Sequence, residues 1–258
     1  MPGDPPAALA ENAGGSSPYV LLCEHAANYI PPKYDRLGLD ETALRRHIAW
    51  DIGAAPLARL LSRGLDAPLF LSGYSRLLID CNRPLGTATS IPERSEDVMI
   101  PGNAGLSALE RSRRAATYFV PFQTMVADEL DRRTRLAIPT IVVGVHSFTP
   151  VFAGVARPWQ AGVLFAAAAE FGRALVMQLA ADPALIVGEN QPYQIEPEHD
   201  HTVPVHGDGR GIAAALLEIR QDLLSSDDDV AAWSERLLPA LAALAGHARA
   251  PGAVPCAQ

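Results

Sequence analysis

Two histidines and one aspartate are the residues of this sequence whose types and positions best suit metal chemistry. His25 and His146 each follow an apolar run that is typical of a buried strand, and Asp51 lies in a predicted helix after the first run. Because the carboxyl ends of parallel strands meet at one edge of a sheet, these side chains can converge there. Two imidazoles and a carboxylate form a common catalytic zinc site with a fourth position open to water. The alternative is that both histidines are ordinary hydrogen-bonded residues at strand ends.

Glu218 is the candidate for proton transfer, because a carboxylate inside an apolar run is costly to bury unless it is paired, hydrogen-bonded or used. Its alternative role is an ion pair with a neighbouring arginine. A second polar group surrounds residues 77–79 and consists of Arg76, Asp80, Asn82 and Arg83. Its arginines can bind a substrate carboxylate in bidentate fashion or brace the loop that follows, and bracing is the role expected of Asp80.

Other reactive side chains have weaker patterns. His47 lies one turn before Asp51 on the predicted helix and is a reserve ligand. Cys23 and Cys81 have no visible base partner, so we expect them to be inert packing residues. A later loop contains three histidines: His199, His201 and His206. This cluster predicts either a second metal site or a solvent-exposed group of side chains. The sequence has no GxSxG, Walker or Rossmann glycine motif, which argues against the commonest serine hydrolase and nucleotide-binding classes.

The elements that must position these residues can be read from the spacing of apolar residues. Strands are predicted over residues 19–23, 68–72, 77–80, 139–145, 162–165, 185–187 and 213–219. Helices are predicted over residues 41–63, 106–136 with a kink or division at Pro121, 166–179 and 230–248. Loops are expected over residues 84–105 and 188–211. The alternation predicts an α/β fold, a three-layer α/β/α sandwich with a mostly parallel mixed sheet, in one domain over residues 18–250.

Composition limits the partners of the protein. Hydrophobic residues are 48% and charged residues 19% of the 258 positions, a balance that argues for a globular protein. The net charge of −8 argues against nucleic-acid or membrane-surface binding and favours a small-molecule substrate. Three cysteines without a CxxC pair suit a reducing cytoplasm. Residues 1–17 are predicted to be a disordered leader, and no apolar run reaches the roughly 18 residues of a membrane span.

Six ordered segments between Tyr19 and Leu224 resemble the N-formylglutamate amidohydrolase family. They are Cys23–Asn28 with Pro31 shortly after, His47–Ala54, Tyr74–Pro84, Val145–Pro150, Gly188–Tyr193 and Glu218–Leu223. The resemblance implies a hydrolase-like fold related to zinc carboxypeptidases and aspartoacylases, in the phosphorylase/hydrolase-like class. It also implies metal-dependent hydrolysis of the amide bond in a small N-formyl or N-acyl amino acid.

Carried over by position, the resemblance assigns a role to each candidate. His25 and His146 would bind one zinc ion, with Asp51 or the adjacent Glu24 as the third ligand. Glu218 would be the general base and acid for a zinc-activated water, and Arg76 would stabilise the oxyanion. The substrate would be bound by Asn82, Arg83 and Arg220, together with Asn190 and Tyr193 on a lid-like loop.

Two departures from the family pattern leave the substrate open. The first segment reads Cys-Glu-His where histidine-degrading relatives have Pro-His, and residues 195–207 are rich in histidine where relatives show Tyr-Thr and Arg-His-Gly. N-formylglutamate is therefore one option among N-acyl amino acids. The alternative functions are a non-catalytic amino-acid-binding protein on the same fold and a small peptidase or amidase with a different substrate. The sequence leaves the oligomeric state and the identity of the metal undetermined.

Overall fold

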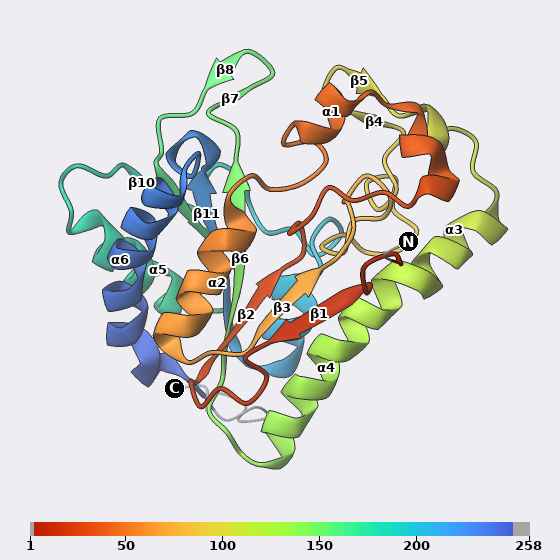
Figure 1. Ribbon diagram of the computed structural model, residues 1–258. Helices are drawn as coiled ribbons and strands as arrows, with labels where there is room; N and C mark the ends of the chain where they lie inside the picture. Colours follow the sequence, from red (N-terminus) through yellow and green to blue (C-terminus); the bar gives the residue numbers. More distant parts are fainter. Residues whose placement is uncertain (1–2, 250–258) are drawn as a thin grey trace.

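A seven-stranded sheet forms the middle layer of the protein, which the computed structural model describes over residues 3–249 (Figure 1). Its strand order is β1 (Ala8–Glu11), β3 (Leu69–Ser72), β2 (Tyr19–Cys23), β6 (Ile141–Phe148), β11 (Ala213–Arg220), β9 (Ala161–Leu164) and β10 (Val187–Glu189). β1 is antiparallel to β3 and β9 is antiparallel to β11, whereas the other neighbours are parallel. The predicted mostly parallel mixed sheet is therefore confirmed.

Helices cover both faces of this sheet (Figure 1). On one face lie α2 (Ala54–Leu65), α5 (Ala169–Ala180) and α6 (Asp227–Leu244), and their apolar residues share a core with alternate strand residues such as Val143. On the other face lies α4 (Val120–Arg135), which packs with the opposite set, such as Val142. Because successive side chains of a strand point to opposite faces, one strand supplies both cores. The three-layer α/β/α sandwich is confirmed.

The helix predicted over residues 41–63 is wrong as a single element. The chain forms α1 (Glu41–Arg45), a turn, and then α2. The turn depends on Gly53, whose φ of 80° is in the left-handed region and whose Cα lies against Leu224, so that a Cβ there would be 2.3 Å from the Leu224 Cβ. Asp51 consequently lies in the turn and not on a helix, and its backbone N–H donates to the His25 carbonyl at 3.0 Å. The predicted shared helical face of His47 and Asp51 does not exist.

One predicted strand and one strand boundary are also wrong. Residues 77–80 form no strand: residues 77 and 78 lie in a turn, and the Asp80 N–H donates to the Ser90 carbonyl at 2.8 Å. The strand expected to end before His146 continues to Phe148, because β11 pairs with β6 along its whole length. Residues 8–11, within the segment expected to be a disordered leader, form β1 and occupy the open edge of β3.

The remaining elements lie close to their predicted positions. The long helical segment is divided into α3 (Ala108–Arg114), a π-helical turn (Ala115–Phe119) and α4, with Pro121 in the first turn of α4. The loop over residues 84–105 contains the small hairpin β4 (Arg94–Ser95) and β5 (Val98–Met99). A second hairpin, β7 (Val151–Phe152) and β8 (Val155–Ala156), projects beyond the end of β6 (Figure 1). None of the helices described between residues 3 and 249 combines the length and hydropathy needed to cross a bilayer.

Candidate metal centre and active site

Parallel pairing of β2 with β6 brings two distant histidines together. His25 lies two residues after the end of β2, and His146 lies near the carboxyl end of β6. Their ring centroids are 4.9 Å apart and their planes are nearly perpendicular. The turn before α2 adds Asp51 to this pair. The convergence expected at the carboxyl edge of the sheet is therefore present.

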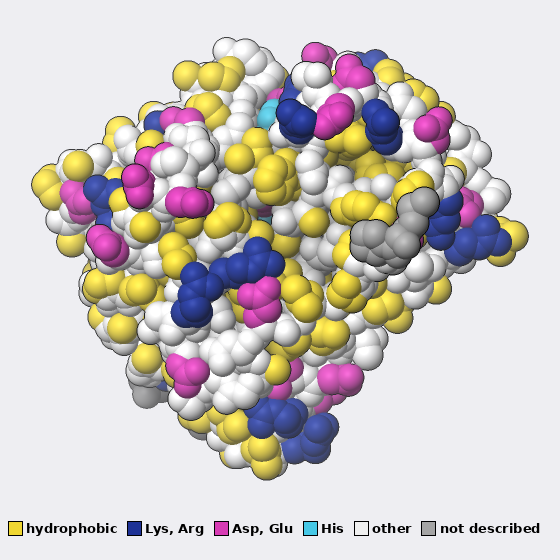
Figure 2. Space-filling view, viewed as in Figure 1, with side chains coloured by type: hydrophobic (Ala, Val, Ile, Leu, Met, Phe, Trp, Pro, Cys, Tyr) yellow, Lys and Arg dark blue, Asp and Glu magenta, His cyan; other side chains and the backbone are white. Residues whose placement is uncertain are grey.

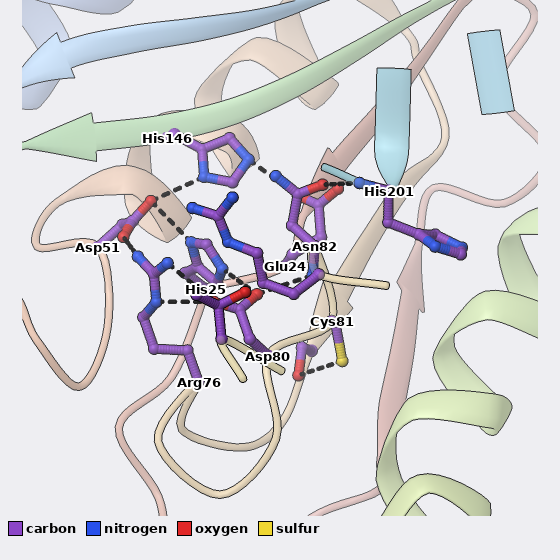
Figure 3. A network of polar contacts seen from close by, with 12 residues as sticks. Glu24, His25, Asp51, Arg76, Asp80, Cys81, Asn82, His146 and His201 are labelled. Atoms are coloured by element: carbon purple, nitrogen blue, oxygen red, sulfur yellow. Dashed lines mark hydrogen bonds and ion pairs between the residues drawn. The ribbon is translucent and has the colours of Figure 1, made fainter. Parts of the chain in front are cut away.

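The three side chains direct one donor atom each to a common point (Figure 3). Asp51 Oδ2 lies 3.2 Å from His25 Nδ1 and 2.8 Å from His146 Nδ1. The three donor atoms lie within 4.8 Å of one another, and all three residues are buried. Two imidazole nitrogens and one carboxylate oxygen are a donor set that zinc accepts in catalytic sites.

A second carboxylate lies behind each imidazole. His25 Nε2 is 2.8 Å from Asp80 Oδ1, and His146 Nε2 is 3.1 Å from Glu24 Oε2. The other oxygen of Glu24 accepts a hydrogen bond from the Thr202 hydroxyl. A carboxylate on the far nitrogen fixes the imidazole tautomer and makes the near nitrogen a better ligand, as in many zinc sites. Glu24 thus contacts the side of His146 opposite Asp51, whereas Asp51 lies between the two histidines.

The site carries more buried negative charge than positive charge. Glu24, Asp51, Asp80 and Glu218 are buried, and Arg76 is the guanidinium that lies among them. Arg76 donates to Asp80 at 3.0 and 2.8 Å and lies 3.4 Å from Asp51. Isolated buried charges are costly, so this excess of carboxylates suits a bound divalent cation. The donor chemistry and the charge balance both fit a metal ion.

The pKa values of the site follow from burial and from these pairs. Burial opposes ionisation of Asp51, but His25 and His146 hold the pKa of its carboxyl well below the usual range. Burial also opposes protonation of His146, but its hydrogen bond to Asp51 and the nearby carboxylate of Glu24 raise the pKa of the imidazole. The shift of Asp51 favours its ionised form, which is the form that binds a metal, whereas His146 must release its extra proton to act as a ligand.

Glu218 is the fourth buried carboxylate of the site. It lies on β11 directly opposite His146 on β6, is buried, and lines the cavity. Its Oε2 atom makes no hydrogen bond within the described chain. Burial raises the pKa of its carboxyl to about 7. A carboxyl with this pKa can both accept and donate a proton near neutral pH.

The cavity at this edge of the sheet has a volume of about 590 Å³. Three predicted substrate-binding residues line it: Asn82, Arg83 and Tyr193. Arg83 donates to the His199 carbonyl and lies 3.3 Å from Asp200, and Asn82 accepts from the Thr202 N–H at 2.9 Å. In Figure 2 a histidine is visible in a hollow near the top of the view, beside basic and acidic side chains.

Arg220 and Asn190 lie elsewhere. Arg220 pairs with Asp222 at 2.8 Å and donates to backbone carbonyls of the 157–159 segment. The Asn190 amide oxygen accepts from the Phe165 N–H at 2.8 Å and so braces its own loop. Neither is among the described residues that line the cavity. The structure does not bring them to the three donor atoms.

The other histidines do not form a second donor set within residues 3–249. His47 lines the cavity and contacts Glu96 at 3.2 Å. His199 is exposed, while His206 is buried and contacts the Gln123 amide oxygen at 2.6 Å. Burial raises the pKa of the thiols of the two buried cysteines, Cys23 and Cys81, which suits packing and not nucleophilic attack.

Several contacts of the site were not identified from the sequence. Asp80 was expected to brace a loop, and it does pair with Arg76, but it also orients His25. Thr202 supports Glu24, and Phe152 lines the cavity from the β7–β8 hairpin. Neither Thr202 nor Phe152 lies in a pattern that indicates such a role, because both reach the site only through loop geometry.

The comparisons with known proteins agree with this arrangement. The model of the N-formylglutamate amidohydrolase family matches residues 17–225, so the chain belongs to that family. The crystal structure of gene product Atu2144 from Agrobacterium tumefaciens is 35% identical, with a TM-score of 0.91, and the match covers 94% of this chain and 96% of that one. No match was found among curated proteins. The family therefore supports an amidohydrolase activity on a small molecule.

A more distant structure has the same fold. The N-formylglutamate amidohydrolase from Ralstonia eutropha JMP134 is 14% identical, with a TM-score of 0.65, and the match covers 93% of this chain and 97% of that one. At this identity the likeness establishes the shared fold alone.

Proposed function

We propose that the protein is a metal-dependent amidohydrolase that cleaves the amide bond of a small N-formyl or N-acyl amino acid. One observation carries this proposal. Two imidazole nitrogens and a carboxylate oxygen lie within 4.8 Å of one another beside a cavity, in a chain of an amidohydrolase family. A donor set of this kind is well suited to hydrolysis of an unactivated amide.

His25, Asp51 and His146 would hold the ion, for which zinc is the best candidate. When bound, the ion supplies Lewis-acid polarisation of the amide carbonyl and activates a water molecule. Asp80 and Glu24 would accept the Nε2 protons of the two histidines, which leaves both Nδ1 lone pairs free for the metal.

Glu218 would move the protons of the reaction. Its free Oε2 can take a proton from the attacking water and then deliver it to the nitrogen of the departing amine. A pKa of about 7 suits both steps, because the group is neither a strong base nor a strong acid at neutral pH. The buried environment that raises this pKa is therefore part of the proposed mechanism.

Arg76 would stabilise the carbonyl oxygen as it becomes anionic. Its guanidinium is held by Asp80 and Asp51, so it needs little reorganisation during the reaction. Asn82, Arg83 and Tyr193 would contact the substrate from the cavity wall. This proposal omits Arg220 and Asn190, which have other partners.

Elemental analysis and a substrate screen test the proposal together. We expect about one zinc per chain, release of free amine from N-formyl or N-acyl amino acids, and loss of both metal and activity in His146→Ala. A fully active, metal-free His146→Ala protein would refute it. Amino-acid binding without turnover would support the binding-protein alternative, and turnover of peptides alone would support a peptidase.

A further inference from the structure

One wall of the cavity is aromatic. Phe148 at the end of β6, Phe152 on β7 and Tyr193 after β10 all line it, and we refer to these three residues as the aromatic wall. The rings come from separate segments, and two of them, Phe152 and Tyr193, are about 40% exposed, at 41% and 42%. Exposed aromatic rings at the mouth of a polar site form a surface for an apolar group of a ligand.

Arg157 holds the aromatic wall together. Its guanidinium carbon lies 5.8 Å from the Phe148 centroid, 4.6 Å from the Phe152 centroid and 4.7 Å from the Tyr193 centroid. It donates to the Tyr193 hydroxyl at 2.9 Å and is only 9% exposed. Within residues 3–249 it has no carboxylate partner, so its contacts are with the wall and the backbone beside it. These cation–π contacts keep three rings from separate segments in one surface.

The charges of the cavity limit what else a substrate can carry. Six carboxylates but only three arginines line it. Arg76 and Arg83 already contact Asp80 and Asp200, respectively. Among the described residues, Arg94 on the β4–β5 hairpin is the one lining arginine without a carboxylate at ion-pair distance, and its Nε contacts the Met99 sulfur. Of the three lining arginines, only Arg94 is therefore free to bind a carboxylate, which suits a substrate with one carboxylate better than a dicarboxylate.

We infer that the preferred substrates are N-acyl amino acids with a single carboxylate and a large apolar side chain, which packs against the aromatic wall. This inference rests on the proposed function and narrows its substrate class. The α-carboxylate would be bound through Arg94, and Arg157 is a positioning residue that acts through the three rings. A glutamate side chain would place its second carboxylate against these rings, where the Arg157 guanidinium is only 9% exposed, is stacked on the rings and does not line the cavity.

The experiment compares kcat/KM for N-formyl-L-phenylalanine and N-formyl-L-glutamate. We expect the wild-type protein to favour the phenylalanine substrate by about tenfold or more, since apolar contacts of this size discriminate at that level. Phe152→Ala should lower this ratio by about fivefold, mainly through the phenylalanine substrate. Val155→Ala is the matched control, because Val155 lies on the same hairpin, is 68% exposed and does not line the cavity.

Arg157→Lys tests the positioning role, because lysine keeps the charge but loses the planar group that contacts the rings. We expect the same fall in the substrate ratio with a folded protein by circular dichroism. A wild-type preference for the glutamate substrate, or a ratio unaffected by Phe152→Ala, would overturn the inference and leave the amidohydrolase assignment intact. Hydrolysis of no N-acyl amino acid would overturn the proposed function and this inference with it.

Discussion

Replacement of Glu24 by glutamine distinguishes its two possible roles, which are direct binding of the metal and support of His146. Glu24 is buried, with one oxygen at the Thr202 hydroxyl and the other 3.1 Å from His146 Nε2. Glutamine has the same size and keeps an acceptor oxygen, so the fold and the imidazole orientation should persist. It removes the negative charge behind the ring, which makes His146 Nδ1 a weaker ligand.

The expected effect follows from the position of Glu24 behind a ligand. Loss of such a supporting carboxylate weakens metal binding about 10- to 100-fold, or about 1.4 to 2.7 kcal/mol. Glu24→Gln should therefore still bind one zinc ion per chain, but with lower affinity. Asp51→Asn should lose stoichiometric binding, because the Asp51 oxygen faces both histidine Nδ1 atoms.

Competition with a chromophoric chelator measures these affinities directly. Glu196→Gln is the matched control, because Glu196 lines the cavity but is exposed and contacts His199 instead of His25 or His146. It should bind zinc like the wild-type protein. Wild-type affinity in Glu24→Gln, or complete loss of zinc there with retention in Asp51→Asn, would refute the assignment of the two carboxylates.

Three further predictions concern catalysis, pH and the backbone. Glu218→Gln should keep its zinc but lose about 100-fold or more in kcat, because only proton transfer is removed; an unchanged kcat would contradict this role. Burial lowers the pKa of His206 to about 4. As the pH falls, the unfolded chain therefore takes up this proton before the folded chain does, and the free energy of unfolding should fall by about 3 kcal/mol between pH 6.5 and 4. Urea denaturation should show a shallower acid dependence in His206→Gln; an identical slope would argue against it. Gly53→Ala should lower the free energy of unfolding by more than about 1 kcal/mol and reduce zinc affinity, because the turn that holds Asp51 would clash with Leu224; an unchanged thermal midpoint would disprove this.

Local sequence patterns determined much of the sheet and its active edge. Apolar runs identified β2, β3, β9 and β11 to within one residue and β6 to within three, because a buried strand needs consecutive apolar side chains. The polar residues that follow or interrupt these runs, His25, His146 and Glu218, were thereby marked as candidates. The ordered motifs added the family, which the match over residues 17–225 establishes.

Only the tertiary structure decided which of the candidates meet. Apolar spacing ran through residues 41–63 as one helix, but the left-handed Gly53 turns the chain and carries Asp51 to the histidines. Glu24 and His25 are neighbours in the chain, yet Glu24 contacts His146 Nε2 whereas His25 Nδ1 contacts Asp51, since successive residues at a strand end point in different directions. The local spacing of apolar residues indicates which side chains are buried, whereas strand pairing, turns and loop contacts bring distant residues together. For that reason the three donor atoms, the carboxylates behind them and the aromatic wall held by Arg157 became visible only in the folded chain.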